Sequence, residues 1–96
     1  MDQRINETMK MFISQVLAFL PVQKIILYGS YARGTQRTDS DIDLAIVVDQ
    51  LSENWIKVTG RLFLLAAELD IRIEPNLIIS SKNKSEFLES MYLLRF

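Results

Sequence analysis

The chain has 96 residues, of which 49% are hydrophobic, with 3 Gly, 2 Pro, no Cys and no His, and its formal net charge is -1. This size and composition predict one compact domain over residues 1–96. Disulfides, Cys-ligated zinc and histidine metal sites are excluded, so any bound metal should be a hard ion that prefers oxygen. The near-neutral charge and the scattered basic residues argue against non-specific binding of nucleic acid.

The ends and apolar runs of the chain bear on its location and its partners. Residues 1–10 lack the charged-then-apolar layout of a secretory signal. The longest apolar runs, such as Leu44 to Val48, are far shorter than the roughly 20 residues that span a bilayer. We therefore expect a cytoplasmic protein with no membrane segment. A chain this short has a thin core, which leaves room for a homo-oligomer or for docking on a partner.

The first part of the chain predicts a helix, a strand and a turn. Apolar residues at helical spacing predict a first helix that ends before Pro21, with its apolar face made by Ile5, Met9, Phe12, Val16 and Leu20. The run from Lys24 to Tyr28 predicts a buried strand, which Gly29 ends. Residues 30–33 suit a short helical turn, and the polar stretch 34–40 suits a loop.

Residues 41–48 predict a second strand, whose side chains alternate between two faces. Asp41 and Asp43 share one face with Ala45 and Val47, whereas the other face is wholly apolar. The two carboxylates therefore lie together on the same side of the strand.

The second half predicts a long helix, a third strand and a last helix. Ser52 or Asn54 caps the long helix, whose apolar positions are Trp55, Val58, Leu62, Leu65 and Leu69. Residues 70–79 predict a strand in which Pro75 indicates an edge position or a bulge. Asn83 and Glu86 resemble a capping pair for a helix running to about Leu94. The order of elements predicts an α/β (α+β) fold, a small mixed sheet covered by helices.

The Gly29-Ser30 pair and the Asp41/Asp43 pair suit phosphoryl or nucleotidyl transfer when they act together. Backbone N–H groups at a strand-to-helix turn can meet a phosphate, and glycine offers no Cβ to obstruct it. Two aspartates on one strand face can hold Mg²⁺, and two such ions about 4 Å apart would stabilise the charge of the reacting phosphate. Arg33 is a further candidate for phosphate contact.

Each feature alone has a plainer interpretation. A Gly-Ser pair after a strand is usually only a turn, and an Asp-x-Asp sequence is often a solvated strand end. The combination of Gly29-Ser30-Tyr31-Ala32-Arg33-Gly34 with Ser40-Asp41-Ile42-Asp43-Leu44 is much more specific, because both motifs and their separation are present.

This stretch resembles the signature of the DNA polymerase beta nucleotidyltransferase superfamily. The small size resembles its minimal nucleotidyltransferase (MNT) members, the antitoxins found beside HEPN-domain toxins. The resemblance implies catalytic and metal-binding roles for Asp41 and Asp43, and nucleotide contacts at Gly29, Ser30, Arg33, Gly34 and Ser40. It also implies a third carboxylate, for which we choose Asp70 because it opens the next predicted strand, with Glu74 on the same face as the alternative.

The resemblance further implies transfer of a nucleoside monophosphate, AMP from ATP, with two Mg²⁺ ions. The implied acceptor is a hydroxyl such as a tyrosine of a partner HEPN toxin, and the implied role is that of an antitoxin. The alternative is a binding module that neutralises or regulates a partner protein by contact, with little or no turnover. An Asp41→Asn/Asp43→Asn double variant separates the two hypotheses, because neutralisation of the partner at wild-type strength would contradict the enzymatic one.

Overall fold

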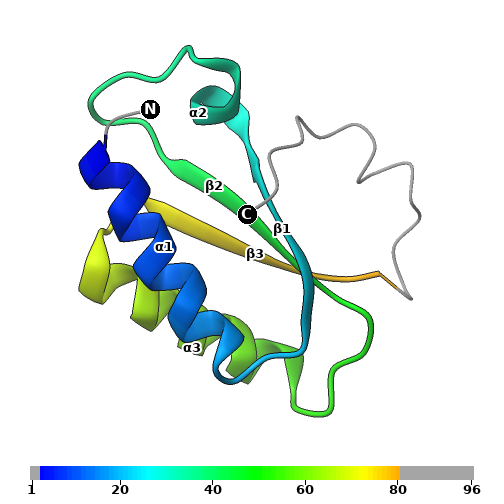
Figure 1. Cartoon of the computed structure of the whole chain (residues 1–96). Coiled ribbons are helices and arrows are strands. Elements are labelled where there is room, and N and C mark those ends of the chain that lie inside the picture. The colour runs from blue at the N-terminus through cyan, green and yellow to red at the C-terminus, as the bar shows by residue number, and fades with distance from the viewer. Residues whose placement is uncertain (1–2, 81–96) are drawn as a thin grey trace.

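The computed structural model describes residues 3–80. Three helices and three strands follow one another in the order α1, β1, α2, β2, α3, β3 (Figure 1). Their bounds are α1 Gln3–Leu17, β1 Val22–Tyr28, α2 Gly29–Arg33, β2 Ile42–Val48, α3 Trp55–Leu69 and β3 Ile73–Ile79.

The strands form one three-stranded sheet in the order β1-β2-β3. β1 pairs with β2 in the antiparallel sense, whereas β2 pairs with β3 in the parallel sense across the α3 crossover. The sheet is therefore mixed, as the sequence predicted. β3 is an edge strand, which explains why Pro75 is tolerated within it.

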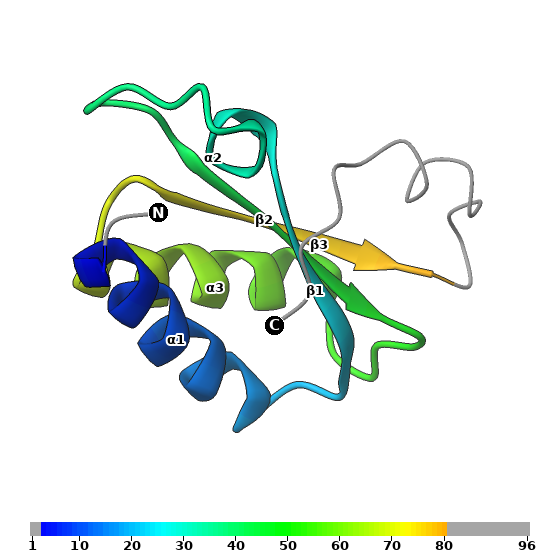
Figure 2. The same ribbon diagram turned by 45° about the horizontal axis from the view of Figure 1, so that its top comes forward.

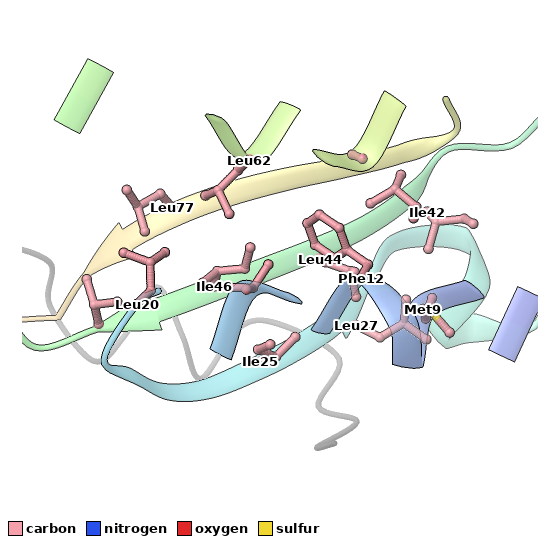
Figure 3. Close-up of a cluster of buried hydrophobic side chains, with 14 of the residues drawn as sticks. Met9, Phe12, Leu20, Ile25, Leu27, Ile42, Leu44, Ile46, Leu62 and Leu77 are labelled. Atoms are coloured by element: carbon pink, nitrogen blue, oxygen red, sulfur yellow. The ribbon is translucent and has the colours of Figure 1, made fainter. Parts of the chain in front are cut away.

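Helices α1 and α3 cover one face of the sheet, and α2 lies at the end where β1 finishes and β2 begins (Figures 1 and 2). The packed face joins both helices to alternate residues of every strand. Met9, Phe12 and Leu62 are fully buried against strand residues such as Leu44 and Ile46 (Figure 3). Burial of this apolar surface supplies the main driving force for the fold.

The long helix begins and ends with identifiable caps. The Asn54 carboxamide accepts hydrogen bonds from the backbone N–H groups of Ile56 (2.8 Å) and Lys57 (3.3 Å), which confirms Asn54 as the N-cap. At the other end, Asp70 is the C-cap, and its N–H donates to the carbonyl of Ala66 at 2.8 Å.

The predicted fold class is confirmed, but α1 ends at Leu17 rather than just before Pro21, β2 starts at Ile42 rather than Asp41, and three further predicted details differ. β1 starts at Val22 rather than Lys24, and β3 starts at Ile73 rather than Asp70. Trp55 does not join the core: it is 47% exposed, and its indole N–H donates to the Leu77 carbonyl on the edge strand at 3.3 Å. The predicted last helix lies outside the described residues. Among residues 3–80, no helix is long and apolar enough to cross a membrane.

Candidate active site

Acidic side chains gather at the α2 end of the sheet, on the face opposite α1 and α3. The register aligns Tyr28 of β1 with Asp43 of β2, and Asp43 with Glu74 of β3. Asp41 precedes Asp43 by two residues, so alternation along the chain turns both carboxylates toward this face. The strand pattern predicted that the two aspartates share a face, and the structure confirms it.

The Gly29-Ser30 turn lies directly against Asp43. Gly29 has φ 75°, a left-handed conformation that favours glycine. A Cβ built on Gly29 would lie 3.2 Å from Asp43 Cγ and would overlap Asp43 Oδ2. Only glycine therefore fits between the turn and the carboxylate, so the two sequence motifs meet in space.

The electrostatics of this cluster reflect crowding of like charges. Burial, followed by the charge of Asp41, raises the pKa of Asp43, while a hydrogen bond with Glu74 and the charge of Arg33 act in the opposite direction. Burial also raises the pKa of Glu74, and the charges of Asp43 and Asp41 raise it further. The cluster therefore resists holding its full negative charge, as expected for carboxylates that share a partly buried site.

The donor set fits Mg²⁺ in its chemistry. Mg²⁺ takes carboxylate oxygens and retains several waters, so two or three carboxylates suffice to hold it. Within residues 3–80, however, no three acidic side chains already enclose a position suited to a metal ion. The fit consequently rests on three oxygen donors on one face and on a like-charge repulsion that a divalent cation would remove.

The other predicted nucleotide contacts lie around the same turn. Ser30 is the second residue of α2, and its carbonyl accepts a hydrogen bond from the N–H of Thr35 at 2.9 Å. Gly34 ends α2 with φ 73° and has open space where a Cβ would stand, so its backbone conformation accounts for the glycine. Arg33 is close enough to Asp43 to affect its pKa. The Ser40 hydroxyl accepts from the Arg37 N–H at 2.7 Å and closes the loop.

Asp70, our first choice for the third carboxylate, lies elsewhere. It ends α3 instead of opening β3, because the chain turns there and the Ile73 N–H donates to the Asp70 carbonyl at 3.0 Å. Its carboxylate forms an ion pair with Arg72 at 2.7 Å, which lowers the pKa of Asp70. The structure thus brings Glu74, the alternative, beside Asp43 and engages Asp70 with Arg72.

Two polar residues of the site were missed from the sequence. The Asn76 side-chain N–H donates to the Tyr28 hydroxyl at 2.5 Å, across the middle strand. Burial, together with the charges of Asp43 and Glu74, raises the pKa of Tyr28. Both residues alternate onto the carboxylate face, but their meeting depends on the register, which no motif reports.

The chain is similar to known proteins in sequence and in fold. The sequence profile of the nucleotidyltransferase domain family matches residues 9–93. A protein of Methanocaldococcus jannaschii, provisionally named a protein adenylyltransferase, is 31% identical over 94 residues and 91% of each chain.

Among solved structures, a chain from a crystal structure of a toxin-antitoxin with AMP-PNP has a TM-score of 0.55 and 26% identity. The match covers 88% of this chain and 61% of that one, so the present chain spans less than two-thirds of that neighbour's length. These relatives agree with the resemblance to the minimal nucleotidyltransferases. The chain belongs to the nucleotidyltransferase domain family and is a nucleotidyltransferase.

Proposed function

We propose that the chain transfers AMP from ATP to a hydroxyl group of a partner protein. The observation that carries the proposal is the row formed by Asp43 and Glu74, with Asp41 two residues away, beneath the Gly29-Ser30 turn. Carboxylates that hold metal ions beside a phosphate-binding turn match the demands of nucleotidyl transfer.

Each residue of the site has a proposed role in the transfer. Asp41, Asp43 and Glu74 would hold two Mg²⁺ ions, which neutralise phosphate charge and help to activate the acceptor oxygen when bound. Gly29 lets the backbone approach the phosphates closely, and Ser30 adds a hydroxyl donor. Arg33 lies near Asp43 and supplies positive charge for the triphosphate. We assign the third carboxylate position to Glu74 in place of Asp70.

The acceptor is proposed from the family. One relative is provisionally named a protein adenylyltransferase, and one structural neighbour is a toxin-antitoxin with AMP-PNP, an adenine nucleotide. We therefore propose that the acceptor is a tyrosine of a HEPN-domain toxin and that its modification blocks the toxin. The chain would then act as an enzymatic antitoxin.

The test is intact mass spectrometry of every chain after incubation with ATP and Mg²⁺, with and without the co-purifying partner. We expect one or more AMP additions on the partner, abolished by EDTA and by the Asp41→Asn/Asp43→Asn double variant. Parallel reactions with GTP, CTP and UTP test the preference for adenine. No addition from any nucleotide, together with unchanged neutralisation by the double variant, would show that the chain acts by contact alone.

A further inference from the structure

A groove adjoins the carboxylates on the side of α3. It has a volume of about 220 Å³ and is lined by Asp41, Phe63, Ala67, Ile71, Ile73 and Glu74. Two catalytic candidates thus form one end of a hollow whose other walls are apolar. The nucleotide-binding turn does not line it.

The apolar wall continues along the outer surface of α3. Ile56, Gly60, Phe63 and Ala67 recur at helical spacing on the side of the helix that faces away from the core. Ile56 is 74% exposed, Phe63 45%, and Ile71, just beyond the helix, 86%. Within residues 3–80 these side chains stay exposed along α3, which has 15 residues and extends about 22 Å.

We propose that this groove and the exposed apolar stripe of α3 bind the acceptor, which is a polypeptide segment carrying a tyrosine among apolar residues. The inference rests on the proposed function and deepens it, because it locates the acceptor on the enzyme. The tyrosine ring lies against Phe63 and Ile71, and its hydroxyl points toward Asp41 and Glu74.

The shape and charge of the groove favour this occupant over others. Its volume is below the roughly 300–1,000 Å³ of ordinary small-molecule sites, so it suits a single side chain. The stripe extends well beyond the groove, which suits a macromolecule. The charged residues that line the groove are both acidic, so a polynucleotide backbone would meet repulsion there rather than Lys or Arg.

The placement fits the chemistry of the transfer. The tyrosine oxygen forms a bond to the α-phosphorus of ATP, and the bond from that phosphorus to the bridging oxygen of the β-phosphate breaks. Pyrophosphate leaves with that electron pair, and the hydroxyl proton passes to a carboxylate of the site. An acceptor held at the α3 side approaches from Glu74, while the Gly29-Ser30 turn leaves the nucleotide on the side of β1.

Binding can be tested without turnover by nuclear magnetic resonance of the ¹⁵N-labelled chain. The probe is a hexapeptide of Leu and Ala with one Tyr, compared with a hexameric oligoadenylate RNA. We expect the peptide to shift the amide signals of residues 63–74, and the RNA to leave them unchanged. The Ile71→Asp variant should lose the peptide-induced shifts, whereas Leu17→Asp, on the exposed side of α1, should keep them.

Transfer to the peptide supplies the second readout. With ATP and Mg²⁺, Ile71→Asp and Phe63→Ser should raise the KM for the peptide at least tenfold and leave the KM for ATP unchanged. The peptide with Phe in place of Tyr should bind equally well and gain no AMP.

The outcomes separate this proposal from the proposed function. Peptide shifts that map outside residues 63–74, no shifts at millimolar peptide, or groove shifts caused by the RNA would overturn the acceptor groove, even if the partner protein gains AMP. Shifts in the groove without any AMP transfer would support the docking surface and contradict the enzymatic function instead.

Discussion

The two faces of the β1-β2-β3 sheet are made by alternate residues of the same strands, and they differ in what surrounds them. Toward α1 and α3, Leu44 and Ile46 are fully buried among apolar side chains. On the opposite face, Asp43 and Glu74 stand beside each other. Burial and the charge of Asp41 raise the pKa of Asp43, and burial and the charges of Asp43 and Asp41 raise the pKa of Glu74. One face therefore stabilises the fold, while the α2 end of the other carries crowded negative charge that opposes folding.

Neighbouring residues of β2 should show this contrast most strongly. Asp43→Asn should reduce kcat/KM by at least about 10²-fold with little loss of stability, because it removes an oxygen donor of the site. Leu44→Ala should lower the free energy of unfolding by about 2–5 kcal/mol, because it leaves a cavity in the packed face. Urea unfolding and AMP transfer per folded molecule provide the two measurements.

A large loss of stability in Asp43→Asn would contradict this division and indicate that the carboxylate is structural. The matched result for Leu44→Ala is equally informative. If the folded fraction of that variant lost activity as severely as Asp43→Asn, the two faces would be coupled more tightly than their contacts indicate.

The two left-handed glycines at the ends of α2, Gly29 and its C-cap Gly34, sharpen the comparison, since they share nearly the same φ but have different neighbours. Gly29→Ala should displace the Asp43 carboxylate, and misplacement of this kind can cost up to about 10²-fold in rate. Gly34→Ala meets open space and should lose roughly 1–2 kcal/mol of stability from backbone strain, with a smaller loss of activity. Equal effects on activity would mean that close packing against Asp43 is unimportant.

Glu74→Gln tests whether the carboxylate face opposes folding. A raised carboxyl pKa means that the folded state binds more protons than the unfolded state between the two pKa values. The favourable contribution is complete below the ordinary pKa of 4.5 and is lost as pH rises through the folded pKa. Glu74→Gln should therefore have a higher Tm than the wild type at neutral pH, with the difference shrinking in acid.

Mg²⁺ supplies the matching control for this variant, because a ligand that binds only the folded state raises its stability. In thermal unfolding experiments, added Mg²⁺ should raise the Tm of the wild type more than it raises the Tm of Glu74→Gln. A lower Tm for Glu74→Gln at neutral pH would contradict the repulsion and show that Glu74 is well compensated in the folded protein.

Much of this arrangement could be predicted from the sequence, because it depends on local patterns. Alternation along residues 41–48 gave the correct faces for Asp41 and Asp43, and Pro75 correctly indicated an edge strand. The Gly29-Ser30 turn was recognised from its place after a buried strand. These features depend on residues close together in the chain, so no knowledge of strand pairing is needed.

The remaining features depend on register and on exact boundaries. Tyr28, Asn76 and Glu74 join the carboxylate face through pairings across β2, which local patterns do not encode. Asp70 was misplaced because Ile71 and Ile73 alternate as if the strand had already begun. In the structure, the Asp70 carbonyl instead accepts a turn hydrogen bond from Ile73.

The smallest predicted effect concerns Asp70, which lies four residues before Glu74. Its contribution to the stability of the fold should depend on pH in the opposite direction to that of Glu74. Its hydrogen bond with Arg72 lowers its pKa, so its contribution to stability is present above the ordinary value of 3.8 and is lost as pH falls through the folded pKa. Solvent screens this pair, so Asp70→Asn should cost up to about 1 kcal/mol at neutral pH and little in acid.

Activity decides between the two carboxylates. Arg72 also donates to the Tyr31 hydroxyl at 3.3 Å and to the Thr38 carbonyl at 3.2 Å, so Asp70 acts on the loop before β2 only through Arg72. We expect Asp70→Asn to reduce AMP transfer far less than Glu74→Gln. If instead Asp70→Asn removed activity and Glu74→Gln retained it, Asp70 would be the third carboxylate of the site. The choice made from the sequence would then be correct.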